Sequence, residues 1–269
     1  MKHKNYKENF SLIWMNKRGQ TSIFIIVAIV IFVAVLLVYF FYPNIKNVVS
    51  GEFSPSNEIE NCLQSDLKEN IVTLSNQGGY LDPEGFILYQ NDKVKYLCYT
   101  SQYYLPCKVQ QALIKKHFED ELNSVLKTKA ETCISNLVAE FKRRGYEVSA
   151  SSKVDTKVEI VPQRMEFTIM APMSVTKENT QTYDEFKFNI PSEMYNILMI
   201  STSIIDFEST YGNSETNLYT QNYPNIKIDK AELDEGSTVY TVNEVTTKEK
   251  FRFASRSLAW PGGYGRETQ

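Results

Sequence analysis

Residues 21–42 contain no charged residue, no proline and no glycine (TSIFIIVAIVIFVAVLLVYFFY). As an α-helix these 22 residues would be about 33 Å long, enough to cross a hydrocarbon core of about 30 Å. A helix also satisfies every backbone N–H and C=O within the segment, which lipid requires of any spanning structure. We therefore predict a transmembrane helix over 21–42, in direct contact with membrane lipid.

The charges on the two sides of this helix predict its orientation. Residues 1–20 carry five basic side chains and one acidic side chain, a net charge of about +4. The whole chain carries −3, so residues 21–269 carry −3 − 4 = −7. A basic flank stays in the cytoplasm, so 1–20 is a cytoplasmic stub of a single-pass cell-membrane protein. A removable secretory signal is the alternative, but its apolar region would be shorter and a small-residue cleavage site would follow it.

The chain leaves the membrane at a run of four aromatic residues, 39–42, which is typical of the lipid headgroup level. Pro43 then ends the helix, because it has no N–H and disfavours helical geometry in the residue before it. Residues 43–56 are expected to form a tether, and residues 57–269 an extracytoplasmic domain large enough for a real core. The composition, with 17 Tyr and 15 Phe, argues against disorder.

A basic and small-residue motif, Lys17-Arg18-Gly19-Gln20, stands directly before the apolar run. It resembles the class III signal segment of archaeal type IV pilins and related surface proteins, although Phe24 stands where many pilins carry Glu. The resemblance implies cleavage between Gly19 and Gln20 by a prepilin-peptidase-like enzyme. The helix would then serve as a membrane anchor or as the core of a filament.

Three further segments extend the likeness: Cys62 in a helical stretch, Gln77-Gly78-Gly79-Tyr80, and Ser257-Leu258-Ala259-Trp260-Pro261. With the basic motif they resemble a family of single-span archaeal surface proteins that has no assigned activity. The resemblance implies a location and an architecture, and it brings no catalytic residue with it.

The outer domain is expected to be α+β, with amphipathic helices first and an antiparallel β-sheet after them. In the helical part, 57–144, apolar spacing predicts a helix from an N-cap at Ser56 to Gly78 and another from about Val109 to Arg144. FILYQ and VKYLCYT between them predict a hairpin.

The β-rich part, 145–269, alternates apolar and polar residues in three runs between 154 and 190, which predicts an antiparallel meander. A helix is expected from Pro191 to about Phe207, a loop over 209–225, and strands near 238–245 and 249–255.

All four cysteines, Cys62, Cys98, Cys107 and Cys133, lie outside the membrane in this orientation. An even number of cysteines in an oxidising compartment predicts two disulfides. Of the three possible pairings we favour Cys62–Cys133, between two amphipathic helices, with Cys98–Cys107 closing a small loop. A structural zinc site and unpaired buried thiols remain as alternatives, although no C-x-x-C pair exists.

No catalytic, cofactor-binding or metal site is expected, and we predict that the protein is not an enzyme. His117, the only histidine outside, lies in a charged helical stretch typical of a solvated face. The carboxylate pairs Glu119 with Glu121 and Asp234 with Glu235 are expected to be solvated as well. The acidic exterior argues against nucleic acid as a partner.

Tyrosines gather around the small predicted disulfide loop: Tyr96, Tyr99, Tyr103 and Tyr104. Tyrosine is common at binding surfaces, which predicts contact with a protein partner or with another copy of the chain; ordinary packing is the competing explanation. The sequence thus favours a surface-anchored structural or interaction protein. The alternatives are a pilin-like filament subunit processed after Gly19, and an extracytoplasmic solute-binding module or cell-wall-acting enzyme.

Overall fold

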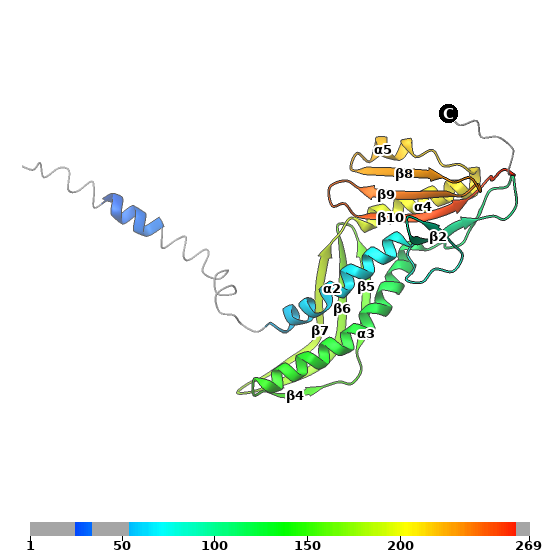
Figure 1. The fold of residues 1–269 in the computed structure, drawn as a ribbon. Coiled ribbons are helices and arrows are strands. Elements are labelled where there is room, and N and C mark those ends of the chain that lie inside the picture. The colour runs from blue at the N-terminus through cyan, green and yellow to red at the C-terminus, as the bar shows by residue number, and fades with distance from the viewer. Residues whose placement is uncertain (1–24, 34–53, 262–269) are drawn as a thin grey trace, which may run out of the picture. The chain divides into compact units, whose positions relative to one another are not determined.

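The computed structural model describes residues 25–33 and 54–261, and the chain divides into two compact units, Met1–Phe53 and Ser54–Gln269 (Figure 1). In the first unit, residues 25–33 are helical, and their large apolar side chains are 47–64% exposed. Across both described ranges, no helix is at once long and apolar enough to cross a membrane.

Several predicted features fall outside the described residues. They are the cytoplasmic stub 1–20 with Gly19 and Gln20, both ends of the span (21–24 and 34–42), and residues 43–53 of the tether.

The second unit begins with two long helices, α2 (Pro55–Asn76) and α3 (Ile114–Arg143). They run antiparallel, since Cys62 is joined to Cys133 and Asp66 forms an ion pair of 3.0 Å with Lys129. The N-cap position of helix α2 is Ser54, whose side chain makes no capping hydrogen bond, and not Ser56 as predicted. Pro55 fits the first turn, where no backbone N–H is needed. Its buried apolar side chains recur every three or four residues: Ile59, Leu63, Leu67 and Leu74.

An antiparallel sheet lies beneath these helices (Figure 1). Its strands are β4 (Glu147–Ala150), β5 (Asp155–Val161), β6 (Arg164–Thr176) and β7 (Thr180–Pro191). β6 is central, pairing with β4 and β5 on one side and with β7 on the other. Its alternating residues build the core against the helices: Met165, Phe167, Ile169, Ala171, Met173 and Val175.

A second, mixed sheet forms the other part of the unit, in the order β1-β2-β10-β9-β8 with β3 also paired to β2. Its strands are β1 (Phe86–Tyr89), β2 (Asp92–Tyr99), β3 (Lys108–Val109), β8 (Ile226–Glu232), β9 (Thr238–Glu244) and β10 (Lys250–Arg256). β10 lies parallel to β2 and antiparallel to β9. Helix α4 (Met194–Tyr211) packs against β2, β9 and β10, and the short α5 (Asn217–Asn222) lies near β8.

The α+β class is confirmed, but the expectation of one antiparallel sheet is wrong. There are two sheets, and one is mixed because the last strand, β10, inserts beside the early strand β2. Strands of the predicted helical part and of the predicted β-rich part therefore share one sheet. The predicted loop 209–225 contains helix α5, and strands β3, β4 and β8 were not predicted.

Candidate functional site

Two disulfides are present, Cys62–Cys133 and Cys98–Cys107, the pairing that the sequence favours. No cysteine is free, so neither a zinc site built on thiolates nor a set of unpaired thiols is formed. Disulfides form and persist in oxidising compartments, which indicates that this is an extracytoplasmic domain.

An exposed group of large apolar side chains lies around the Cys98–Cys107 disulfide, and we call it the aromatic platform. Its members and their exposed fractions are Tyr99 (39%), Tyr103 (45%), Tyr104 (46%), Leu105 (48%) and Trp260 (57%). Strand β2 supplies Tyr99, the loop 100–107 supplies the next three, and the segment after β10 supplies the fifth. Ring contacts join Tyr103, Tyr104 and Trp260, and an exposed apolar cluster of this kind is typical of an interaction site.

Of the four predicted contact tyrosines, Tyr96 does not belong to the platform. It is only partly exposed, and its hydroxyl shares a hydrogen bond of 2.8 Å with the Ser237 hydroxyl. Its ring lies edge-on to Tyr99, with 5.1 Å between centroids. Burial is the largest cause of the raised pKa of Tyr96. Tyr96 therefore supports the platform from within the sheet.

The platform is built by pairing the disulfide loop with the chain that follows β10. The Tyr104 N–H donates to the Ala259 carbonyl (3.0 Å), and the Leu258 N–H donates to the Leu105 carbonyl (3.0 Å). The Cys107 N–H donates to the Ser257 hydroxyl (2.9 Å). These bonds hold Trp260 edge-on to Tyr104, with ring centroids 4.8 Å apart and planes inclined by 86°.

Backbone strain is concentrated where the two segments pair. Tyr104 has φ +61° and Leu258 has φ +49°, a region that side chains with a Cβ rarely adopt. Such residues persist only where the surroundings hold them, and they are common at binding sites. Two glycines leave the space that this segment occupies. Leu258 lies against Gly212 and Ala259 against Gly236, where a Cβ would collide with them.

Replacing Gly212 by alanine is expected to lower the free energy of unfolding by about 3 kcal/mol. Gly212 has φ +94°, and an added Cβ would lie 2.0 Å from Leu258 Cδ1. Gly145→Ala is the matched control: φ there is +81°, but no atom lies within 4 Å of the added Cβ. Urea unfolding of both variants measures the difference. If both variants lost the same unfolding free energy, Leu258 would not be held against Gly212.

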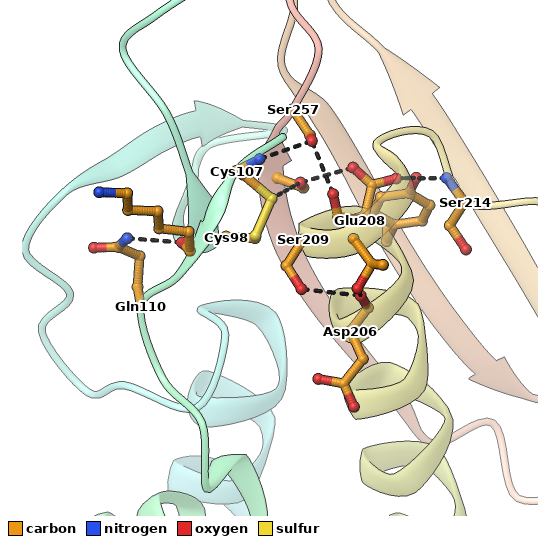
Figure 2. The surroundings of a disulfide bond; sticks show 12 residues. Cys98, Cys107, Gln110, Asp206, Glu208, Ser209, Ser214 and Ser257 are labelled. Atoms are coloured by element: carbon orange, nitrogen blue, oxygen red, sulfur yellow. Dashed lines mark hydrogen bonds between the residues drawn. A yellow bond between two sulfur atoms is a disulfide. The ribbon is translucent and has the colours of Figure 1, made fainter. Parts of the chain in front are cut away.

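A buried carboxylate, Glu208 of α4, connects the platform to the rest of the domain (Figure 2). Its Oε1 accepts hydrogen bonds from the Tyr240 hydroxyl (2.5 Å) and the Ser214 N–H (2.7 Å). Its Oε2 accepts one from the Ser255 hydroxyl (2.9 Å), and its backbone carbonyl accepts one from Ser257 (2.9 Å). Ser255 in turn lies 3.6 Å from Cys107 Sγ. One residue thus joins α4, β9, β10 and the disulfide loop.

Burial dominates the electrostatics of this group. Removal from water raises the pKa of Glu208, and the donors Tyr240, Ser214 and Ser255 counteract part of that rise. The same burial, with the carboxylate beside it, raises the pKa of Tyr240. Because its acceptors are engaged by donors of the domain itself, Glu208 is a structural carboxylate and not a group open to a substrate.

The structure also places two residues that were considered for catalysis, His117 and Glu119. His117 is partly buried against Tyr80 (ring centroids 4.0 Å apart), and burial lowers its pKa. Glu119 is buried, which contradicts the prediction of a solvated side chain; it accepts hydrogen bonds from the Ile160 N–H (2.8 Å) and from Lys115 (2.6 Å). Within the described ranges, no group of three or more His, Cys, Asp or Glu side chains could hold a metal.

A hollow of about 540 Å³ lies on the face of β5–β7, with charged residues in its lining. Those charges are compensated: Lys157 pairs with Glu159 (2.8 Å) and Lys187 with Glu185 (2.5 Å), and Glu166 pairs with Arg164 (2.5 Å), which lies outside the lining. The hollow therefore offers little uncompensated charge to a solute.

Compared with known proteins, the chain matches no family model, no curated protein and no solved structure.

Proposed function

We propose that this protein is a membrane-anchored surface protein that presents its extracytoplasmic domain to a protein partner through the aromatic platform. The platform is the observation that carries the proposal, because Tyr and Trp on a rigid support give large contact area at low entropic cost. In this proposal the protein acts by contact and not by catalysis, and it needs no cofactor. A partner could equally be a second copy of the chain.

The anchor is supported by residues 25–33, an apolar helical segment whose large side chains are all exposed. A helix that is apolar all round needs an apolar environment, which a bilayer provides. The basic residues of 1–20 support a cytoplasmic N-terminus, and the two disulfides are consistent with an exported domain.

Protease treatment of intact cells tests this topology. We expect residues 54–269 to be degraded or released while the N-terminal stub stays protected, and we expect detergent, not salt, to extract the chain. A domain untouched by protease, or a chain released by salt washing, would refute the anchored topology. A variant lacking residues 21–42 is the control, because it should lose membrane association.

A pilin-like subunit processed after Gly19 is the second candidate, favoured by the Lys17-Arg18-Gly19-Gln20 motif before the apolar run. The N-terminus of the protein extracted from membranes distinguishes the two. Mass spectrometry would find Gln20 as the first residue of a processed subunit, whereas a peptide containing Met1 or Lys2 would exclude processing there.

A further inference from the structure

We propose that the outer edge of β7, which faces away from β6, pairs with the same edge of a second copy of the chain. The two domains then share one continuous antiparallel sheet. This surface is separate from the aromatic platform, so the inference goes beyond the proposed function. Three observations lead to it: the opposite edge of the sheet is closed by side chains, β7 is open, and the charges of β7 are complementary to themselves.

The opposite edge of the antiparallel sheet, formed by β5, is closed by helix α3. The Ile160 N–H donates to Glu119 Oε1 (2.8 Å), and the Ile160 carbonyl accepts from Lys115 Nζ (3.3 Å). Lys115 and Glu119 also form an ion pair with each other (2.6 Å), and Glu119 is buried. Both backbone groups of Ile160 are therefore satisfied within the domain and are not available to another strand.

The same contacts show which backbone groups of β7 face outward. Because Ile160 points its N–H and carbonyl at α3, the opposite residue Met165 points its own groups at β7, where it pairs with Ile190. The direction of these groups alternates from residue to residue along a strand. Ile190 therefore bonds to β6, whereas Glu185 and Lys187 point their N–H and carbonyl groups away from it.

This outer edge of β7 is open. β7 has twelve residues, and among the described residues it pairs with β6 alone. No hydrogen bond between described residues reaches the outward backbone groups of Glu185 or Lys187, and both side chains are exposed. Pro191 lies at an outward position too, where the missing N–H costs no bond to β6. A long open strand is a template for another strand, and the edge strands of the other sheet, β1 and β8, have only four and seven residues.

The charges along β7 select how two copies pair. Opposite residues of an antiparallel pair lie on the same face, so a strand that pairs with itself is centred on a residue. Centring on Phe186 brings Glu185 of each copy opposite Lys187 of the other. Centring on Asp184, Glu185 or Lys187 would place two like charges opposite each other. No other centre on β7 brings opposite charges together.

The register centred on Phe186 also aligns the backbone. Glu185 and Lys187 both have outward N–H and carbonyl groups, so each Glu185–Lys187 contact between the copies exchanges two backbone hydrogen bonds. The two-fold axis passes beside Phe186 and generates this contact twice. Two identical surfaces that meet in this way form a closed dimer and not an open filament.

The dimer also suits two chains that are anchored in one membrane. A two-fold axis that joins two edges into one sheet runs perpendicular to the sheet, so the helices of both copies stay on one face. Helix α2 lies on that face and begins at Pro55 (Figure 1). Both chains therefore enter α2 from the same face of the joined sheet, as two anchors in one bilayer require.

Sedimentation velocity of the full-length protein in detergent tests the inference. We expect a dimer, and either Glu185→Lys or Lys187→Glu alone should weaken self-association by about tenfold, because each creates two like-charge pairs. The double variant, Glu185→Lys with Lys187→Glu, exchanges the two charges and should restore the dimer. Lys157→Glu is the matched control and should leave the dimer unchanged. Lys157 pairs with Glu159 along β5 as Lys187 does with Glu185 along β7, but it lies on the other side of β6.

The outcomes separate this inference from the proposed function. A protein that stays monomeric would overturn it, as would a dimer that the single variants leave intact or that the double variant fails to restore. If Trp260→Ala abolished self-association and Lys187→Glu did not, the platform would be the dimer surface and the assignment to β7 would fail. Loss of the dimer in Lys187→Glu should leave partner binding by the platform unchanged. Unchanged urea midpoints would show that the single variants are folded.

Discussion

Replacing Cys62 and Cys133 together by alanine is expected to lower the free energy of unfolding by about 4 kcal/mol. The disulfide joins residues 71 positions apart, and a cross-link over a long loop removes much of the conformational entropy of the unfolded chain. The disulfide also connects the two helices that cover the antiparallel sheet. The nearby Asp66–Lys129 ion pair is too exposed to replace the stability that the disulfide supplies. Equilibrium unfolding in urea measures the loss.

The second disulfide provides the matched comparison. Cys98 and Cys107 are nine positions apart, so their replacement by alanine should cost only about 2.5 kcal/mol by the same loop argument. The loop argument would be wrong if the short-loop variant lost as much stability as the long-loop variant. The short-loop variant should instead show the larger loss of partner binding, because it removes the cross-link that closes the loop of the platform.

Replacing Glu208 by alanine is expected to cost about 3 to 5 kcal/mol of unfolding free energy. The Tyr240 hydroxyl, the Ser214 N–H and the Ser255 hydroxyl would lose their acceptor inside a domain where Glu208 is only 3% exposed. Urea unfolding at neutral pH measures the loss. Glu215→Ala, an exposed carboxylate a few residues further along, is the control and should change stability by less than about 0.5 kcal/mol.

The raised pKa of Glu208 also predicts a pH dependence. A carboxyl whose pKa is higher in the folded state than in the unfolded state stabilises the fold most at low pH. That stabilisation is lost as pH rises from the ordinary value of 4.5 through the folded pKa, because the buried group must then ionise. Glu208→Gln cannot ionise. The unfolding free energy of the wild type minus that of Glu208→Gln should therefore fall over this range; a flat difference would contradict the burial argument.

Most helices and strands could be predicted because their signals are local. Helix α2 and the strands β5–β7 carry apolar residues at the period of their own structure, and one face of each is buried. β8 was missed because Lys and Asp interrupt its apolar residues and only Ile226 is buried. The parallel pairing of β10 with β2 has no local signal at all, since it joins segments far apart in the sequence.

The tyrosines of the platform could be predicted from the sequence, but Trp260 and the hydrogen bonds that hold the platform could not. A cluster of tyrosines inside a small cysteine loop indicated Tyr99, Tyr103 and Tyr104, but Trp260 joins them only through the pairing of the last residues with that loop. Both buried carboxylates lie on the line of buried residues along their helix: Glu119 three residues before Leu122 in α3, and Glu208 four residues after Ile204 in α4. That spacing indicates burial, but the partners of Glu208 come from other elements and have no local signal.

The position of β10 has a consequence for biosynthesis. Synthesis makes β2 early and β10 late, yet β10 must lie between β2 and β9 to complete the sheet. Until residues 250–256 emerge, β2 has an open edge that can pair with another nascent chain. A prematurely terminated product would keep that edge, so chaperones and proteases could distinguish finished molecules from incomplete ones.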